Sequence, residues 1–290
     1  MIKKAFLKAL RSNLWRFLAG DIGTALAFFL VGKNYLSYDY TESFLFGIIV
    51  FIAIFFVRFL YFFLIEVVVY IHNTYVDSIW GKAIVELKDA YAIMHYLRKQ
   101  EAIDDVIFMN SMCAFCDILK GIFDRKTKAD CCVSIKVPSG QFSSIEAWEL
   151  TNLCRDASHR NRDTNDYERT KHTVIGNTPF SVIVSKLLGT KHEEKAFYLN
   201  NDIPGTKDYR NTSVDVYQKG LPYQSELVYA IIPIKSDDKH RYELVGFLCI
   251  DCNKKGAFDE NRYDLPMVEG IVDGIYDIIL LRNKTIKSTK

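Results

Sequence analysis

The chain lacks the sequence motifs of the common nucleotide-dependent and hydrolytic enzymes. Neither basic nor acidic residues are in marked excess. Its 290 residues contain no P-loop, no glycine-rich dinucleotide-binding pattern and no nucleophile-elbow serine. The six histidines form no close pair at helical spacing. The 37 Lys and Arg are balanced by 35 Asp and Glu, which argues against a dedicated nucleic-acid binder. We therefore expect no catalytic residues, no cofactor and no nucleic-acid partner, and we predict that the chain is not an enzyme.

The apolar residues are concentrated near the N-terminus, where they predict two transmembrane helices. Segment 44–64 reads FLFGIIVFIAIFFVRFLYFFL and carries one charge, Arg58. A helix of this length rises about 30 Å, the thickness of the hydrocarbon core of a bilayer. Segment 17–31 is shorter and contains Asp21, but no small-residue cleavage site follows it, as one would after a signal peptide. Because a second apolar segment follows at once, two spans joined by residues 32–43 are the better interpretation.

The distribution of basic residues predicts the orientation of these spans. Five basic residues precede the first span and four follow the second, whereas the connecting loop has one, Lys33. Cytoplasmic loops carry the excess of Lys and Arg. We therefore expect a multi-pass protein of the inner (cytoplasmic) membrane with both termini in the cytoplasm. The flanking basic residues are Lys3, Lys4, Lys8, Arg11, Arg16, Lys82, Lys88, Arg98 and Lys99.

One charged residue lies within each predicted span. Counted along the helices, Asp21 and Arg58 both lie roughly 6–9 Å below the cytoplasmic surface of the membrane. Two antiparallel helices could pair them, and pairing is one way in which charges persist in a membrane. Alternatively, each side chain extends independently to the lipid headgroups. The sequence leaves both interpretations open.

A helical segment follows the second span and has the spacing of a short coiled coil. Trp80, Ile84, Leu87, Tyr91 and Met94 are separated by 4, 3, 4 and 3 residues, which is typical of such a seam. One hypothesis is that this helix pairs with a second copy of the chain in a homo-oligomer. The other is that it packs on its own domain.

The remainder of the chain predicts an α+β domain. Helix 102–123 precedes four expected strands, at 130–137, 196–199, 226–234 and 242–251, and a last helix runs from near Pro266 to near Arg282. We expect these helices to cover one side of a mainly antiparallel sheet, which makes an α+β sandwich. The predicted organisation is a basic N-terminus (1–16), two transmembrane helices (17–71), a helical linker with a possible coiled coil (72–109) and a ligand-binding domain (110–290).

The C-terminal part of this domain resembles the GAF family of regulatory domains. Residues 246–251 read GFLCID and are similar to the closing strand of that family, before a loop with Phe258 and a terminal helix. Asn253, Lys254, Phe258 and Asp259 resemble the signature of cyclic-nucleotide-binding members, although Asp259 follows Phe258 without the usual spacer. In the family this signature supports the fold through a Lys–Asp pair. The resemblance covers residues 110–283 and implies a small-molecule ligand, with a nucleotide as the first candidate.

A pocket in a GAF-like domain would lie between the sheet and the segments that cross one of its faces, including residues 154–180. Arg side chains suit a phosphate because of their planar fork of donors. Nearby acidic residues nearly cancel these charges, so that a solvated, internally paired loop is the alternative. Tyr223 and Ser225 are expected to share one strand face, and Asn177 also suits the start of a helix. The candidate ligand-binding residues are Arg155, Arg160, Arg162, Asn177, Tyr209, Asn211, Tyr223 and Ser225.

The seven cysteines are expected to be mostly reduced thiols in a cytoplasmic domain. The pair Cys113 and Cys116 lies in an apolar helix, and Cys249 and Cys252 lie at the end of a strand, where an offset of three residues points side chains to opposite faces. Neither pair has the turn of a zinc knuckle. The sequence therefore predicts no metal site.

Three hypotheses about function follow. The leading one is a membrane-anchored cytoplasmic sensor that binds a small molecule, with a nucleotide as first candidate, and passes the signal to its membrane helices or to a partner. The second is a bacterial anti-phage effector whose transmembrane helices disrupt the inner membrane when the sensor domain binds a nucleotide; it rests on similarity of architecture alone. The third is a dimerisation scaffold that senses nothing and has a filled, apolar pocket.

Overall fold

The computed structural model describes residues 20, 22–24, 26–34, 39–100, 104–140, 144–162, 172–189, 196–212, 220–233, 244–260 and 263–288. The chain divides into two compact units, Met1–Ser78 and Ile79–Lys290. Helix α2 (Tyr40–Arg98) begins in the first unit and ends in the second.

The first unit contains the most apolar helix among the described residues. By length and composition, α2 and α3 (Asp105–Thr127) are the two described helices that could cross a membrane. In α2 no part of the most apolar window is buried, and this helix contains the predicted span 44–64. The predicted span 17–31 falls partly outside the described residues, and its described residues from Ile22 onward belong to the shorter helix Ile22–Asn34. Asp21 also lies outside the described residues.

The second unit is built on a six-stranded sheet in which every pair of neighbouring strands is antiparallel. In spatial order the strands are β3 (His172–Thr173), β2 (Glu149–Arg155), β1 (Cys131–Pro138), β6 (Gly246–Cys252), β5 (Ser225–Ile231) and β4 (Phe197–Asn200). The α+β class predicted from the sequence is confirmed. The four predicted strands are present with shifted ends, whereas β2 and β3 were not predicted.

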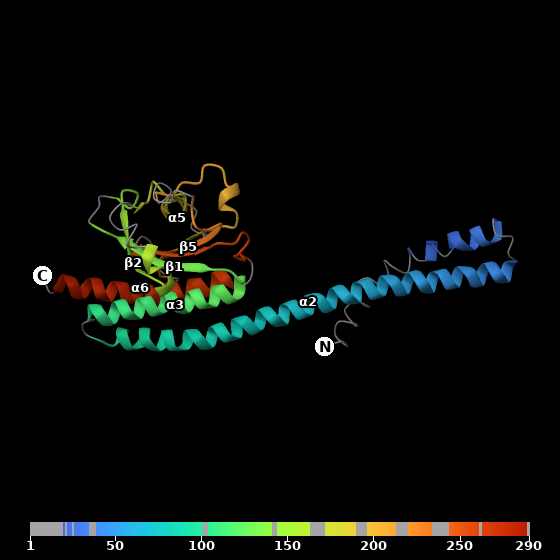
Figure 1. The fold of residues 1–290 in the computed structure, drawn as a ribbon, viewed down its shortest axis with the longest axis horizontal. Helices are drawn as coiled ribbons and strands as arrows, with labels where there is room; N and C mark the ends of the chain where they lie inside the picture. Colours follow the sequence, from blue (N-terminus) through green and yellow to red (C-terminus); the bar gives the residue numbers. More distant parts are fainter. Residues whose placement is uncertain are drawn as a thin grey trace. The chain divides into compact units, whose positions relative to one another are not determined.

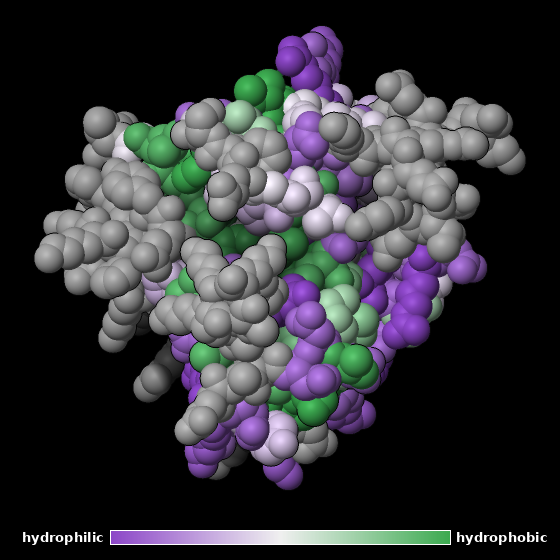
Figure 2. Space-filling model, turned by 90° about the vertical axis from the view of Figure 1, so that its left-hand side faces the viewer, coloured by the Kyte–Doolittle hydropathy of each residue, from purple (hydrophilic) through white to green (hydrophobic). Residues whose placement is uncertain are grey.

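Helices cover both faces of this sheet, and not one face alone (Figure 1). On one face, α3 packs on β1 and β2, and α6 (Asp264–Ser288) packs on β5. On the other face lies α5 (Thr178–Leu188), beside β4 and β5. Two short 3₁₀ helices, η1 (Ala157–His159) and η2 (Ile203–Gly205), lie in the connections. On the side shown in Figure 2, apolar residues are visible inside a hollow that hydrophilic residues border in part.

A β-bulge aligns polar residues of β2 with the α5 face of the sheet. Ser134 lies opposite Arg155, and Lys136 lies opposite Asn152, so that the register shifts between Ile135 and Lys136. Directly opposed residues of antiparallel strands point to the same face. The extra residue in β2 therefore places Arg155 and Asn152 on one face despite their offset of three, which a regular strand would not allow. The Lys136 Nζ donates to Asn152 Oδ1 over 2.8 Å on that face.

Helix α3 has polar groups at both ends. At its start, Asp104 accepts hydrogen bonds from the backbone N–H groups of Val106 and Ile107. At its end, Lys128 adopts the left-handed conformation at φ 54°, and the Lys254 Nζ donates to the Thr127 carbonyl over 2.9 Å. A cation at the C-terminus of a helix is stabilising because of the helix dipole. Lys254, which belongs to the GAF-like signature, thus contacts the C-terminal end of α3.

The C-terminal turns of α2 pack on their own chain, which corrects part of the predicted coiled-coil seam. Trp80, Leu87 and Met94 are buried within the second unit, but Ile84 is 71% exposed. Trp80 packs against Tyr263, the residue before α6, with ring centroids 5.6 Å apart. A Cβ added at Gly274 of α6 would lie 2.8 Å from the Met94 Sδ, so that the two helices approach closely here. The buried seam is shifted toward the face that also carries Ala83, Ala90 and Leu97.

This packing predicts unequal costs for two substitutions within one turn of α2. Leu87→Ala should lower the free energy of unfolding by about 2–3 kcal/mol, because it removes buried methyl groups and leaves a cavity. Ile84→Ala should change it by less than about 0.5 kcal/mol, because its side chain is exposed. Chemical unfolding of the full chain in detergent micelles would measure both. Equal costs for the two substitutions would contradict the intrachain packing.

Candidate functional site

A polar pocket lies on the α5 face of the sheet, beside the apolar core of that face. Phe180, from the first turn of α5, packs on Phe247 of β6 with ring centroids 4.7 Å apart and closes one side. The pocket contains about 570 Å³ of space free of protein atoms, part of it open to solvent. Its lining residues are Ser134, Lys136, Arg155, Arg162, His172, Asn177, Pro179, Phe180, Asn211, Tyr223, Glu226, Val228, Cys249, Ile250 and Asp251.

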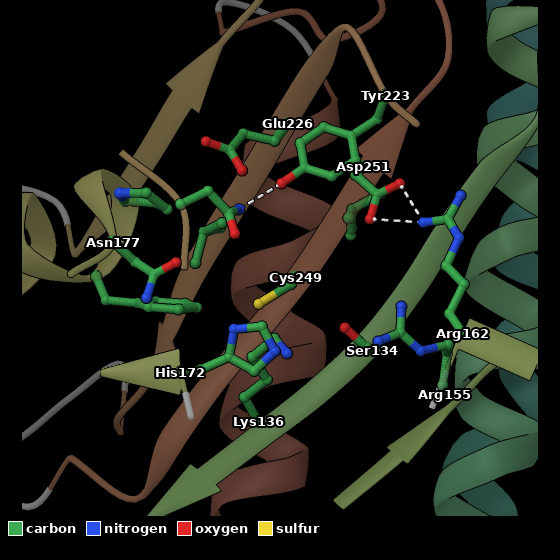
Figure 3. A pocket seen from close by; sticks show the side chains of 15 residues that line it. Ser134, Lys136, Arg155, Arg162, His172, Asn177, Tyr223, Glu226, Cys249 and Asp251 are labelled. Carbon is green, nitrogen blue, oxygen red and sulfur yellow. Dashed lines mark hydrogen bonds and ion pairs between the residues drawn. The ribbon is translucent and has the colours of Figure 1, made fainter. Parts of the chain in front are cut away.

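The central strands supply the floor of the pocket through their cross-strand register. Arg155 of β2 lies opposite Ser134 of β1, which lies opposite Cys249 of β6. One step along the same face, Asp251 of β6 lies directly opposite Glu226 of β5. Figure 3 shows that the pocket places His172 and Lys136 at one end and Glu226 and Tyr223 at the other. The sheet therefore brings cations and carboxyl groups to one cavity.

One wall of the pocket carries an ion pair. The Arg162 Nη1 lies 3.2 and 3.5 Å from the two carboxylate oxygens of Asp251 (Figure 3). Burial raises the pKa of Asp251 above its ordinary value, although Arg162 and Arg155 oppose that rise. The Arg155 Nη1 donates to the Cys132 Sγ over 3.1 Å. Both guanidinium groups thus line the pocket, and one of them is balanced by a carboxylate within it.

Glu226 is a buried carboxyl group, and one of its oxygens has no hydrogen-bond partner among the described residues. The side chain is buried near the start of β5, and the Glu226 Oε1 is the unpartnered atom. Burial raises the pKa of Glu226 to about 8; the nearby Tyr209 hydroxyl acts against the rise and Asp251 adds to it. A buried polar atom without a partner costs about 1–3 kcal/mol.

His172 supplies a second buried polar atom at the opposite end of the pocket. Burial, together with the charges of Lys136 and Arg155, lowers the pKa of His172 to about 3. The imidazole is therefore neutral at physiological pH. Its Nδ1 lies 3.2 Å from the Thr212 Oγ1, whereas its Nε2 has no partner within the described ranges. A neutral imidazole can donate or accept at that nitrogen, depending on its tautomer.

Five of the eight predicted ligand-binding residues line this pocket: Arg155, Arg162, Asn177, Asn211 and Tyr223. Two of them are oriented by neighbours. The amide of Asn177 donates to the Thr173 carbonyl over 2.7 Å and does not cap α5, and its Oδ1 accepts from the Thr212 N–H. The amide of Asn211 donates to the Tyr223 hydroxyl over 2.6 Å.

The other three predicted residues do not line the pocket. The Ser225 Oγ donates to the Lys254 carbonyl over 2.7 Å, on the opposite face from Glu226. The expectation that Tyr223 and Ser225 share a strand face was therefore wrong, because β5 begins at Ser225 and the next residue points into the pocket. Tyr209 is buried near Glu226, and Arg160 is exposed at the end of η1, near Cys113.

Sequence reasoning missed Lys136, His172, Glu226 and Asp251. The signal that could have found three of them is a charged residue inside a strand that is otherwise apolar, as in CCVSIKVP, SELVYAI and GFLCIDC. Burying such a charged residue lowers the stability of the fold unless the charge is paired, so that its presence in a strand indicates a pair or a functional role.

The remaining predicted residues have other surroundings. Phe258 is buried and packs edge-on against Phe123, with ring centroids 5.7 Å apart, and the backbone N–H of Asn253 donates to the Asp130 carbonyl. The backbone N–H of Asp259 donates to the Asp264 Oδ2 over 2.7 Å. In the first unit, a Cβ added at Gly20 would lie 3.8 Å from the Arg58 Nη1. The guanidinium group of Arg58 thus lies close to the residue before Asp21.

One group of possible metal ligands among the described residues is Cys132, Asp156 and His159, whose donor atoms lie within 4.8 Å of one another. These donors already have protein partners. The Asp156 carboxylate accepts from the Val133 N–H and the Ser158 hydroxyl and contacts the His159 Nδ1, and the Cys132 Sγ accepts from Arg155. We interpret this group as a hydrogen-bonded junction that holds the end of β2.

No family model and no curated protein matches the sequence, whereas solved structures do. A GAF domain of a phosphoenolpyruvate-protein phosphotransferase from Coxiella burnetii has a TM-score of 0.42 and 11% identity, over 72% of this chain and 99% of that one. The corresponding Acinetobacter domain has a TM-score of 0.41 and 11% identity, over 68% and 93%. A type II free methionine-R-sulfoxide reductase from Thermoplasma acidophilum has a TM-score of 0.38 and 18% identity, over 60% and 94%.

The last of these structures corrects a prediction made from the sequence. We expected that the chain is not an enzyme, because it lacks familiar catalytic motifs. The structures similar to it include an enzyme, the free methionine-R-sulfoxide reductase, as well as regulatory GAF domains. That prediction was therefore wrong.

Proposed function

We propose that this chain is a membrane-anchored protein whose α+β domain binds a small polar molecule in the pocket between the sheet and α5. One observation carries the proposal: Glu226 and His172 each present a buried polar atom, without a partner among the described residues, at a cavity. Buried polar groups are nearly always satisfied by protein, water or ligand. A molecule with complementary donors and acceptors would satisfy both atoms.

The lining residues indicate the chemistry of that molecule. Lys136, Arg155 and Arg162 favour an anionic group, and Arg suits phosphate or carboxylate through its planar fork. At the other end, Glu226 and Tyr223 favour a group with hydrogen-bonding N–H or O–H atoms. A nucleotide combines a phosphate with base N–H groups, and a free amino acid combines a carboxylate with an ammonium. These two classes are the candidates.

Two features support the membrane anchor. The apolar residues of α2 between positions 44 and 64 are largely exposed, as lipid-facing residues would be. The basic residues around the predicted spans favour both termini in the cytoplasm. The same helix ends in the second unit at Arg98, whose side chain pairs with Asp277 of α6. A signal from the pocket would therefore pass to the membrane through α6 and α2.

Thermal unfolding of the full chain in detergent micelles would test the binding proposal. The panel comprises mononucleotides, cyclic mononucleotides, cyclic dinucleotides and free amino acids. A compound at 100 times its Kd stabilises the folded state by about 2.7 kcal/mol, which raises the Tm of a domain of this size by about 5–10 °C. We expect one class to give such a rise. If no compound raises the Tm, the proposal fails.

The two other hypotheses have distinct tests. A scaffold was expected to have a filled, apolar pocket, and the polar cavity counts against it. An effector would make the membrane helices the output, and the Arg58 guanidinium close to Gly20 of the predicted span 17–31 is the feature that favours it. Expression that depolarises the membrane only when the pocket ligand is supplied would support the effector. Harmless overexpression with a ligand bound would support the sensor.

A further inference from the structure

A short segment, residues 210–212, is held against the start of α5 by hydrogen bonds in both directions. The Thr178 N–H donates to the Arg210 carbonyl over 3.0 Å, and the Arg210 N–H donates to the Thr178 Oγ1 over 2.8 Å. A Cβ added at Gly176 would lie 2.7 Å from the Thr212 Cγ2, so that the methyl group of Thr212 lies close against Gly176. The side chain of Thr212 thus has a fixed orientation.

Two backbone groups fix the orientation of the Asn177 amide. Its Nδ2 donates to the Thr173 carbonyl over 2.7 Å, which requires the amide nitrogen on that side. Its Oδ1 accepts from the Thr212 N–H over 3.1 Å, which requires the amide oxygen on the other side. The second hydrogen of Nδ2 is donated to the Thr212 Oγ1 over 3.0 Å. The Thr212 hydroxyl therefore accepts one hydrogen bond and has its own proton left to donate.

This hydroxyl proton has two possible acceptors among the described residues. The His172 Nδ1 lies 3.2 Å from the Thr212 Oγ1, and the Asn177 Oδ1 lies 3.4 Å from it. The longer distance exceeds the usual range of an O–H···O bond, which ends near about 3.0 Å, and the Asn177 Oδ1 already accepts from a backbone N–H. If the His172 Nδ1 carried a proton and donated it, the hydroxyl would have only the longer contact. The shorter contact therefore places the hydroxyl as the donor, and a neutral imidazole that accepts at Nδ1 carries its proton on Nε2.

We propose that Thr212 sets the tautomer of His172, so that the Nε2–H donates to an oxyanion, a carboxylate or phosphate group, of the pocket ligand. His172 is buried, and its Nε2 has no partner in the described part of the chain. His172 lies at the same end of the pocket as Lys136 (Figure 3), and the positive charges of Lys136 and Arg155 both act on it. The inference rests on the proposed function, and Thr212 is a positioning residue because it acts through His172.

The two cations by themselves favour the other tautomer, because a lone pair on Nε2 would interact favourably with their charge. The contact with Thr212 therefore decides where the proton lies. Thr212→Val keeps the shape of the side chain and removes the hydroxyl, so that the proton should move from Nε2 to Nδ1 and the anion should lose its donor. Thr212→Ser keeps the hydroxyl and should retain the native tautomer.

Nuclear magnetic resonance would give the tautomer directly. The full chain, labelled with ¹⁵N at histidine, is studied in lipid bilayers, where protonated and unprotonated ring nitrogens have distinct ¹⁵N shifts. His172→Gln identifies the His172 signals by their loss. We expect the proton on Nε2 in the native chain and in Thr212→Ser, and on Nδ1 in Thr212→Val. A native His172 with its proton on Nδ1 overturns the inference, as does an unchanged tautomer in Thr212→Val.

Titration of the same samples with sodium phosphate and, separately, with sodium acetate tests the anion site. The probe that binds more tightly indicates which oxyanion the ligand carries. It should shift the Nε2 signal of His172, and Thr212→Val should weaken its binding at least about 10-fold, as expected for one hydrogen bond to a charged group.

The outcomes separate this inference from the proposed function. A probe that binds without shifting the Nε2 signal overturns the inference and leaves the binding pocket in place. If the tautomer is as expected but neither probe nor any compound of the panel binds, the contact with Thr212 is confirmed, whereas the proposed function and the anion site are overturned.

Discussion

Glu226→Gln is expected to stabilise the protein at neutral pH by about 3 kcal/mol. The pKa of the buried Glu226 is raised from its ordinary 4.5 to about 8, so that at pH 7 folding requires this carboxyl group to take up a proton. Each unit between the solution pH and the ordinary pKa then costs about 1.4 kcal/mol. Glutamine has nearly the same shape and needs no proton. The substitution therefore removes the cost.

The sign of this effect gives it a distinctive pH dependence. Because the pKa is higher in the folded state, the folded protein binds more protons than the unfolded chain between pH 4.5 and about 8. Stability of the native chain should therefore fall as pH rises through this window, and Glu226→Gln should flatten that slope. At pH 4 the two proteins should be equally stable.

Chemical unfolding in detergent micelles, followed by tryptophan fluorescence, to which Trp80 and Trp148 of the second unit contribute, would measure the effect from pH 4 to pH 8. Glu146→Gln is the control, since Glu146 is exposed and its neutralisation should change stability little. If the Glu226→Gln protein is less stable than the native chain at pH 7, the native carboxylate is ionised and paired. The interpretation of Glu226 as a neutral, buried carboxyl group without a full set of partners would then be wrong.

Asp156→Ala is expected to destabilise the second unit by about 3–5 kcal/mol. Its fully buried carboxylate accepts hydrogen bonds from the Val133 N–H over 2.9 Å and from the Ser158 hydroxyl over 2.6 Å, and it contacts the His159 Nδ1 at 2.8 Å. Removing one member of a buried charged network leaves its partners unsatisfied. Alanine would also release the end of β2, where Arg155 projects into the pocket.

The pH dependence of Asp156 has the opposite sign to that of Glu226. Burial alone would raise the pKa of Asp156, but the hydrogen bonds from His159, Ser158 and Val133 more than offset burial and lower it. The contribution of Asp156 is therefore present above pH 3.8 and is lost as the pH falls. Ser158→Ala removes one of the three partners and should cost only about 1 kcal/mol. Similar costs for the two substitutions would show that the carboxylate is not the centre of the junction.

The elements that the sequence predicts well are those defined by local patterns. Strands β5 and β6 are nearly unbroken apolar runs, and α6 begins at Asp264, close to Pro266, where proline suits the first helical turn. Strand β2 reads ELTNLCR and was missed, because its polar residues face a pocket that only the assembled sheet creates. Its bulge, which sets the direction of Arg155, likewise depends on pairing with β1.

The site itself could be predicted only in part. Arg155, Arg162 and Tyr223 were found because their side chains suit a polar ligand, but the same reasoning selected Arg160, which is exposed. Glu226 was missed because acidic residues are rarely buried, so that composition assigns them to the surface. Its position follows from the register that places it opposite Asp251. Strand pairing decides which residues share a cavity. Because the paired strands lie far apart in the chain, a local stretch of sequence does not show this pairing.

The most direct test of the proposed binding pocket compares Arg155→Ala with Arg160→Ala. Both remove one guanidinium group, but Arg155 lines the pocket and Arg160 is exposed outside it. The measurement is titration calorimetry of the full chain with the panel compound that raises the Tm most. Loss of a charged hydrogen bond weakens binding by about 1.5–3 kcal/mol, or roughly 10- to 150-fold. We expect this loss for Arg155→Ala and native affinity for Arg160→Ala; equal affinity of the two variants would contradict binding in this pocket.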